Sequence, residues 1–391
     1  MYFQTLDDKS ECVGVYTQGK LHFDEIPAGL TRTWRATGSI VDAAIEYAYL
    51  HAGGRRLEEV CPEDLKEDLL AAQKTFRAYL KAFKIGKISM RTHCFFDLVP
   101  ESFLMEFCEI KNKITEHVFD TTERQPHYEM LDNIHRLLTT IKLRDLNLNT
   151  DDCRELQHSS RDRRLVNELV NHYKYIDYNL FGTVTGRLTT AQNSFPILTL
   201  KRAFRKLVKP HNDWFISLDY NGAEARTMLH LAGQEQPQTD IHEWNVENFF
   251  KSHRDRETAK TLFFAWLYNP DSSALKAECY NREKVLDEWY RGGYIYTPYE
   301  RKILVDDRRA LNYLIQSATS DRVLMRAVEI DKYLEGKKSF VSHIVHDEIV
   351  IDFSDEERDN MLEIKQIFEK DNFVANVNAG KNYAELEKLK L

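Results

Sequence analysis

The sequence is poor in cysteine and has no long apolar run, and each shortage excludes a class of protein. Its 391 residues include 6 Cys and 9 Pro. The cysteines, at positions 12, 61, 94, 108, 153 and 279, show no CxxC spacing, so reduced thiols are expected rather than a disulfide or zinc framework. No apolar stretch reaches the ~18 residues of a membrane-spanning helix. The first residues lack a basic segment followed by an apolar one, so no signal peptide is expected. We therefore expect a cytoplasmic protein without a membrane partner.

Charge is unevenly distributed along the chain. The net charge is −8. Between Arg154 and Pro210 there are 11 Lys and Arg against 4 Asp and Glu, a local +7 that leaves −15 on the remainder. From Asp347 to the end, 12 acidic residues face 6 basic ones. A basic belt on an acidic body suits a polyanion bound along one surface, although a solvated helix face would have the same composition.

The chain is long enough for about two or three modules. Residues 1–30 predict a small β-hairpin with a turn around Gly19. Residues 39–142 have a helical pattern, with expected helix starts at Pro62, Pro100 and about Tyr128. This part carries no evident catalytic constellation, and we expect it to grip a ligand or act as a scaffold.

One stretch places a carboxylate at the end of a strand. The apolar and aromatic run Trp214–Leu218 predicts a buried strand that ends on Asp219. Asn221 and Gly222 then interrupt the strand, and a helix is expected from Ala223.

A second apolar run, from Val341 to Phe353, contains the acidic residues Asp347 and Glu348. If two strands each bring a carboxylate to one place, they form a site for a divalent metal ion. A structural cap or turn is the alternative for either carboxylate alone.

Two helical stripes and one loop carry polar residues at regular spacing. Arg256, Lys260, Phe264 and Tyr268 are four residues apart and share one helix face, where cations suit a triphosphate and rings suit a sugar and base. That helix is expected to end at Asn269, which tolerates a left-handed conformation.

The second stripe consists of Arg308, Asn312 and Gln316, whose donors suit the minor-groove acceptors common to all base pairs. Arg187 lies in a Gly-rich, Thr-rich loop with donors for phosphate or base edges. A solvated surface is the alternative reading of each pattern alone.

Taken in order, these pieces resemble the family A DNA polymerases, the DNA polymerase I type, over roughly residues 175–391. Five blocks occur in the family's order. The first two are Thr185–Leu188, which matches TGRL, and Asp219–Arg226, which resembles DYSQIELR. The third combines Asp240–His242, like DIH, with the helix Arg256–Tyr268, like RxxxKxxxFxxxY; the fourth, Arg308–Asp321, resembles RxxxNxxxQGTAAD; and the fifth, His346–Glu348, is identical to HDE. Asn221 and Gly222 stand where the family motif has Ser and Gln, and Ala265 and Asn269 stand where it has Gly.

The resemblance implies an α/β (α+β) right-hand polymerase with an antiparallel β palm, helical fingers and a helical thumb. The expected modules are residues 1–30 as a hairpin in the palm, 31–150 as a thumb-like helical region, 151–232 as palm with the first metal carboxylate, 233–335 as compact fingers and the primer-template helix, and 336–391 as the rest of the palm.

The implied activity is template-directed addition of dNTPs to a primer 3′-OH by two-metal-ion nucleotidyl transfer, without a proofreading exonuclease. The implied cofactor is two Mg²⁺ ions, with Mn²⁺ able to substitute. The implied site is catalytic Asp219, Asp347, Lys260 and Glu348; metal-binding Asp219, Tyr220 (through its carbonyl) and Asp347; nucleotide-binding Glu224, His242, Arg256, Lys260, Phe264 and Tyr268; and DNA-binding Arg187, Arg308, Asn312, Gln316 and His346.

The expected partners are primer-template DNA and dNTPs, and candidate further partners are a separate exonuclease, a clamp or a helicase. A bacteriophage source is a further hypothesis, which would place the protein in the host cytoplasm. Two alternatives stay open: a single-subunit RNA polymerase-like enzyme, and a non-catalytic primer-template-binding subunit of a replication complex.

Overall fold

The computed structural model describes residues 1–40, 44–151, 153–250, 255–272, 275 and 277–389. The chain divides into two compact units, Met1–Arg144 and Asp145–Leu391, which are described separately. No helix in the described ranges is long and apolar enough to cross a bilayer.

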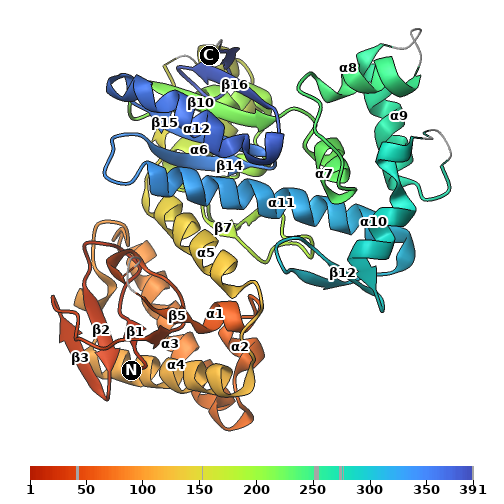
Figure 1. Cartoon of the computed structure of the whole chain (residues 1–391). Helices are drawn as coiled ribbons and strands as arrows, with labels where there is room; N and C mark the ends of the chain where they lie inside the picture. The colour runs from red at the N-terminus through yellow and green to blue at the C-terminus, as the bar shows by residue number, and fades with distance from the viewer. Residues whose placement is uncertain (41–43, 152, 251–254, 273–274, 276, 390–391) are drawn as a thin grey trace. The chain divides into compact units, whose positions relative to one another are not determined.

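Unit 1 combines a small sheet with three long helices (Figure 1). Its elements are β1 Gln4–Thr5, β2 Gly14–Thr17, β3 Lys20–Phe23, β4 Arg32–Thr33, β5 Glu46–Tyr47, α1 Ala48–His51, α2 Leu57–Val60, α3 Lys66–Ile85, α4 Glu101–Thr121 and α5 Tyr128–Leu143. The helix starts expected near Pro62, Pro100 and Tyr128 agree with α3, α4 and α5, with a short 3₁₀ turn ahead of α3.

The expected N-terminal hairpin is present as β2 and β3, with Gln18 and Gly19 at positive φ in its turn. Its strands pair with β1 in a separate three-stranded sheet of unit 1, in the order β1-β2-β3. The assignment of residues 1–30 to the palm stays a prediction.

The expectation that all cysteines are reduced thiols is wrong for Cys12 and Cys94, which form a disulfide with Cα atoms 5.5 Å apart. Their separation of 82 residues gave no spacing signal, because the tertiary fold alone brings them together. A buried hydrogen bond from the Phe95 amide to Asp7 Oδ2, at 2.7 Å, joins the same two segments.

Unit 2 contains the remaining elements. They are β6 Asn147–Leu148, α6 Ser160–His172, β7 Tyr178–Asn179, β8 Thr189–Thr190, β9 Val208–Lys209, β10 Trp214–Tyr220, α7 Ala223–Leu231, α8 Ile241–Asn245, α9 Arg256–Tyr268, α10 Arg282–Trp289, β11 Tyr290–Arg291, β12 Tyr294–Tyr296, β13 Lys302–Leu304, α11 Asp307–Tyr333, β14 Phe340–Val345, β15 Glu348–Phe353, α12 Met361–Phe368, β16 Ala375–Gly380 and β17 Glu387–Lys388.

The main sheet of unit 2 is antiparallel, in the order β14-β15-β10-β16-β17. β10 is its central strand, and four of its seven residues, Phe215 to Leu218, are buried in succession. The run is apolar except for Ser217, whose buried hydroxyl donates to Glu348. The predicted antiparallel β layer is confirmed.

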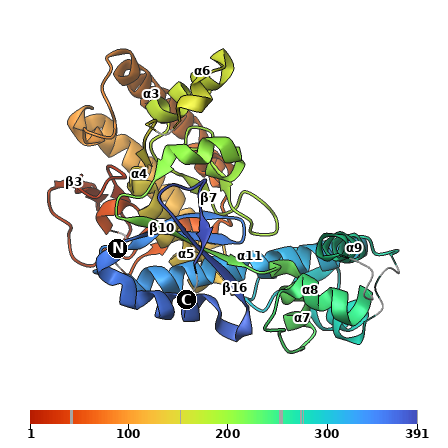
Figure 2. The same ribbon diagram turned by 90° about the horizontal axis from the view of Figure 1, so that it is seen from above.

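Helix α11 connects the two ends of unit 2. It packs against β14, β15 and α12 at one end, and against α7, α9 and α10 at the other. Figures 1 and 2 both show α7, α8 and α9 gathered to one side of the five-stranded sheet along α11. These helices enclose an apolar core that includes Phe263, Trp266 and Tyr280. A pocket lies where this helical group meets the sheet.

Candidate active site

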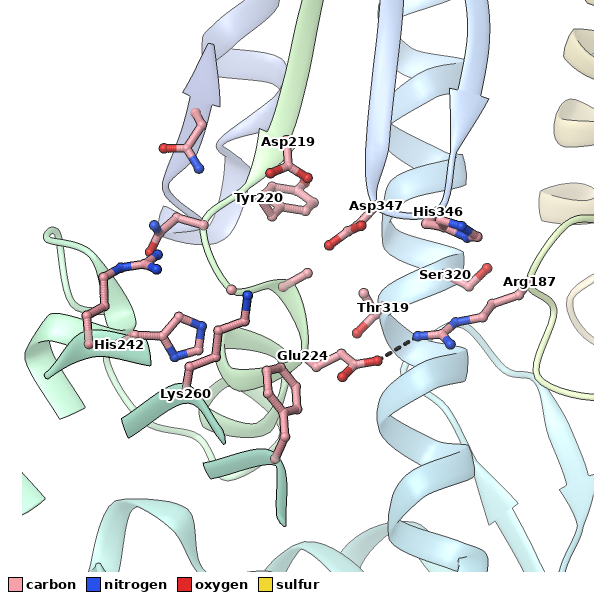
Figure 3. Close-up of a pocket in the computed structure, with 16 residues that line it drawn as sticks. Arg187, Asp219, Tyr220, Glu224, His242, Lys260, Thr319, Ser320, His346 and Asp347 are labelled. Carbon is pink, nitrogen blue, oxygen red and sulfur yellow. Dashed lines mark hydrogen bonds and ion pairs between the residues drawn. The ribbon is translucent and has the colours of Figure 1, made fainter. Parts of the chain in front are cut away.

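Two strand ends bring Asp219 and Asp347 to one pocket of about 540 Å³. Asp219 is the penultimate residue of β10, and Asp347 lies in the turn between β14 and β15. The preceding residue, His346, has a φ of +57°, which allows the tight turn. Both carboxylates face the same space in Figure 3. The predicted meeting of two carboxylates is confirmed, with one refinement: the second apolar run is a hairpin rather than one strand.

The carboxyl groups in the upper part of the pocket oppose one another's ionisation. Burial, and then the charges of Asp347 and Glu348, raise the pKa of Asp219 to about 8, against lowering effects from an Asn376 hydrogen bond and Lys260. A carboxyl whose ionisation is opposed by neighbouring carboxylates is stabilised by a bound cation. Within the described ranges, no three His, Cys, Asp or Glu side chains form a complete ligand set. A metal here would therefore need ligands from the main chain, substrate or water.

Glu348 and Tyr220 have other partners for their side chains. Glu348 accepts hydrogen bonds from Ser217 Oγ at 2.5 Å and Tyr383 Oη at 2.8 Å, and it does not line the pocket. The Tyr220 ring stacks on Phe368 at 4.0 Å and its hydroxyl donates to the Phe368 carbonyl. Main-chain atoms of Tyr220 are thus the ones that can serve a metal.

Helix α9 forms the opposite wall and runs over Arg256–Tyr268 as predicted. Asp255 caps it by accepting a hydrogen bond from the Thr258 amide. Lys260 and Phe264 line the pocket, and Lys260 makes no ion pair within the described residues. The left-handed conformation expected at Asn269 is wrong: its φ is −107° and its ψ 106°. Pro270 explains this, because a residue before proline is driven into extended conformations.

His242 and Arg256 complete the wall of the pocket that carries Lys260. Burial lowers the pKa of His242 to about 4, so the ring is neutral at pH 7. Its Nδ1 atom is buried without a hydrogen-bond partner in the described structure. Arg256 is held by Asp240 through two hydrogen bonds, from Nε at 3.1 Å and Nη2 at 2.8 Å. A phosphate would therefore meet Lys260, which has no ion pair among the described residues, and Arg256, which Asp240 orients.

Glu224 lies at the floor of the pocket between two donors. Arg187 Nη2 donates to its Oε1 at 2.6 Å, as drawn in Figure 3, and the Tyr268 hydroxyl donates to its Oε2. Burial, followed by the Glu224 charge, raises the pKa of Tyr268 far above its ordinary value. Glu224 thus joins the loop of Arg187 to the end of α9.

The Arg187 loop is hydrogen-bonded to α11 and packs on a buried ion pair. Gly186, at a φ of +78°, packs against the guanidinium of Arg301, and its carbonyl accepts from Ser320 Oγ at 2.9 Å. Arg301 pairs with the fully buried Asp321 at 2.6 Å. A side chain at position 186 would meet the Arg301 guanidinium, so the glycine is required.

The row on α11 has the expected helical spacing but does not line this pocket. Gln316 Nε2 donates to Asn312 Oδ1 at 2.5 Å, and Arg308 forms an exposed ion pair with Asp271 at 2.7 Å. Their contact with DNA stays a prediction.

Sequence reasoning missed three residues that line the pocket: Thr319, Ser320 and Asn376. Thr319 and Ser320 lie three and four residues after Gln316, so continuing the helical stripe would have found them. Asn376 pairs with Asp219 across β10 and β16, a relationship without any sequence signal.

Several known proteins are similar to this chain in sequence or in structure. No protein-family model matches the chain. The thermostable DNA polymerase I of Thermus aquaticus is 26% identical over 227 residues, 45% of this chain and 27% of the relative. DNA polymerase I of Chloroflexus aurantiacus is 23% identical over 236 residues, 47% of this chain and 25% of the relative. The matches thus span about a quarter of these relatives' length.

One solved structure has a similar fold: the POL domain of Pol1 from M. smegmatis, in complex with DNA primer-template and dNTP. It superimposes with a TM-score of 0.55 at 13% identity, over 86% of this chain and 81% of that one. The predicted α/β polymerase fold is therefore confirmed. The chain therefore has the fold of a polymerase domain, and over a little under half of its length its sequence resembles DNA polymerase I, a family A enzyme.

Proposed function

We propose that the chain is a DNA-directed DNA polymerase that adds dNTPs to a primer 3′-OH. The observation that carries the proposal is the opposition of Asp219 and Asp347 to Lys260 across one pocket. Phosphoryl transfer needs positioning and charge neutralisation more than a reactive side chain, and this arrangement provides both. The DNA polymerase I relatives and the structural neighbour support it.

We propose Mg²⁺ as the cofactor, with Mn²⁺ able to substitute. Asp219 and Asp347 fit such ions, because burial and the neighbouring carboxylates oppose the ionisation of Asp219, and a divalent cation would favour it. Asp219, Asp347 and the Tyr220 carbonyl would hold two ions, which supply activation of the 3′-OH and neutralisation of the triphosphate and leaving pyrophosphate. Glu348 supports the site indirectly, since Ser217 and Tyr383 hold it in place.

The opposite wall would bind the nucleotide. Lys260 and Arg256 offer positive charge to the β- and γ-phosphates, whereas neutral His242 can offer a hydrogen bond. Phe264 would pack on the sugar, and Tyr268 would lie near the templating base. Their rings are stacked, with centroids 5.9 Å apart.

Glu224 would exclude a 2′-OH from the floor of the pocket, where Arg187 and Tyr268 fix its carboxylate. We propose that Arg187, Arg308, Asn312, Gln316 and His346 contact the primer-template. A separate exonuclease, clamp or helicase is proposed as a further partner.

Extension of a labelled primer on a DNA template, with dNTPs or NTPs and with or without Mg²⁺, tests the proposal. We expect Mg²⁺-dependent extension with dNTPs. Extension with NTPs at equal efficiency would favour the RNA polymerase alternative. Failure to extend under any metal condition, with primer-template still bound, would favour the non-catalytic subunit.

A further inference from the structure

Asn221 lies where β10 ends and α7 has yet to begin, two residues after Asp219. It is 6% exposed. Its Nδ2 donates to Asp240 Oδ2 at 2.7 Å, and its Oδ1 accepts from the Ile241 amide at 2.8 Å. One side chain therefore uses both ends of its amide to hold the start of α8.

Arg226, which is fully buried, is hydrogen-bonded to the same junction. Its guanidinium donates to the carbonyls of Asn221, Pro237 and Thr239 at 2.7–2.8 Å. Its Nη2 also donates to Asn221 Oδ1 at 3.3 Å. The end of β10 and the segment before α8 are thus joined to each other by buried hydrogen bonds.

Gly222 allows this close approach. It has a φ of +67°, and a side chain there would collide with Ile241. Asn221 and Gly222, two of the positions at which the chain departs from the family motif, therefore both contact the start of α8.

Asp240 passes this anchoring on to α9. Its Oδ1 accepts from the amides of His242 and Glu243 and from Arg256 Nε, and its Oδ2 accepts from Asn221 Nδ2 and Arg256 Nη2. Although burial opposes ionisation, the hydrogen bonds from Arg256 and Asn221 hold the pKa of Asp240 well below its usual range. Asp240 is thus an ionised carboxylate fixed on both sides, and it orients Arg256 with two parallel bonds.

We propose that Asn221 is a positioning residue, which fixes Asp240 and through it aims Arg256 at the triphosphate end of the pocket. The proposal rests on the proposed function in one respect, namely that the ligand is a nucleoside triphosphate. Asp240 does not line the pocket; Asn221 does, and we assign its effect to the hydrogen bond that holds Asp240. A serine hydroxyl lies one bond closer to the main chain than the asparagine amide atoms, so it would not reach both Asp240 and the Ile241 amide.

The test is nucleotide binding by the full chain carrying a dideoxy-terminated primer-template, so that no turnover occurs. Mg²⁺ and the matching dNTP are titrated into wild type, Asn221→Ser and Asn212→Ser. Asn212 is the matched control, because its Nδ2 donates to the Lys338 carbonyl at 3.0 Å and it does not line the pocket. We expect Asn221→Ser to weaken dNTP binding about tenfold, which corresponds to about 1.4 kcal/mol, and Asn212→Ser to leave it unchanged.

Steady-state extension separates positioning from general damage. With Asn221→Ser we expect the KM for dNTP to rise about tenfold while kcat changes less than about threefold. A second variant pair tests the direction of the bond. Asn221→Asp alone places two carboxylates together and should weaken binding further, and the exchange Asn221→Asp/Asp240→Asn should recover part of the loss.

Each outcome decides between the two proposals. The positioning role is overturned if Asn221→Ser binds dNTP as tightly as wild type, or if Asn221→Asp/Asp240→Asn binds dNTP more weakly than Asn221→Asp alone. This holds whether or not primers are extended. Weakened binding by Asn221→Ser in a protein that cannot extend primers supports the positioning role and overturns only the polymerase activity. Absence of any dNTP binding by the wild type overturns both.

Discussion

Asp219 on β10 and Glu348 on β15 are direct cross-strand partners in the main sheet. Because Asp347 immediately precedes Glu348, this register places the turn residue beside the end of β10. Asp347 can therefore reach the pocket of Asp219, while Glu348 remains in the sheet and binds Ser217 and Tyr383. The pairing of two strands far apart in the sequence thus creates the acidic site.

Removing either pocket carboxylate should abolish catalysis without abolishing DNA binding. Asp219→Asn and Asp347→Asn keep the side-chain size and remove the charge that would hold a divalent ion. We expect extension to fall at least ~10³-fold, about 4 kcal/mol of barrier, with salt-dependent primer-template affinity within about threefold of wild type. Extension assays and fluorescence anisotropy measure the two quantities. An active Asp347→Asn variant would contradict the assignment.

Glu224→Ala should relax the choice of sugar. It removes the carboxylate from the pocket floor and frees both Arg187 and Tyr268. We expect the ratio of ribonucleotide to deoxyribonucleotide incorporation to rise by at least about tenfold, with a smaller loss of dNTP incorporation. Competition between one dNTP and its NTP at a single template position measures the ratio. The control is Glu257→Ala. Glu257 is exposed and pairs with Arg256, so its removal leaves Glu224, Arg187 and Tyr268 at the pocket floor intact.

Acid should destabilise unit 2 partly through His343. This fully buried histidine packs edge-on against Tyr383 at 4.7 Å, and burial lowers its pKa from 6.5 to about 3. The unfolded chain takes up the proton near pH 6.5 and the folded chain only near pH 3. Stability from this residue is therefore present above pH 6.5 and is lost as pH falls towards 3, by up to about 1.4 kcal/mol per pH unit.

His343→Leu removes that proton uptake. We expect the unfolding free energy of the variant to fall less steeply than that of wild type between pH 6.5 and 4.5, even if the variant is less stable at pH 7. Urea titrations at several pH values measure the slopes. Parallel slopes would show that His343 is not the group responsible.

The Cys12–Cys94 disulfide should stabilise unit 1. It closes a loop of 82 residues and thereby restricts the unfolded chain. We expect Cys12→Ser/Cys94→Ser to lower the unfolding free energy by about 2–4 kcal/mol, and a reducing agent to have the same effect on wild type only. The matched control is Cys61→Ser, a buried free thiol in the same unit. Peptide mapping without reduction verifies the bond.

The helices and strands that could be predicted from the sequence are those marked by a pattern within a few residues. The period of four residues placed Arg256, Lys260, Phe264 and Tyr268 on one face of α9, and the apolar run ending at Asp219 marked β10. These predictions held because helix and strand periodicity depend on neighbours within a few residues. The order of the motif blocks then implied which residues would meet.

Contacts between segments that lie far apart in the chain became evident only from the folded structure. It paired Cys12 with Cys94, placed Asn376 opposite Asp219, and directed Glu348 away from the pocket. It also turned Asn221 from an unexplained departure into the residue that joins β10 to Asp240. Burial and strand register set these relationships, and neither can be read from a residue's own neighbours in the chain.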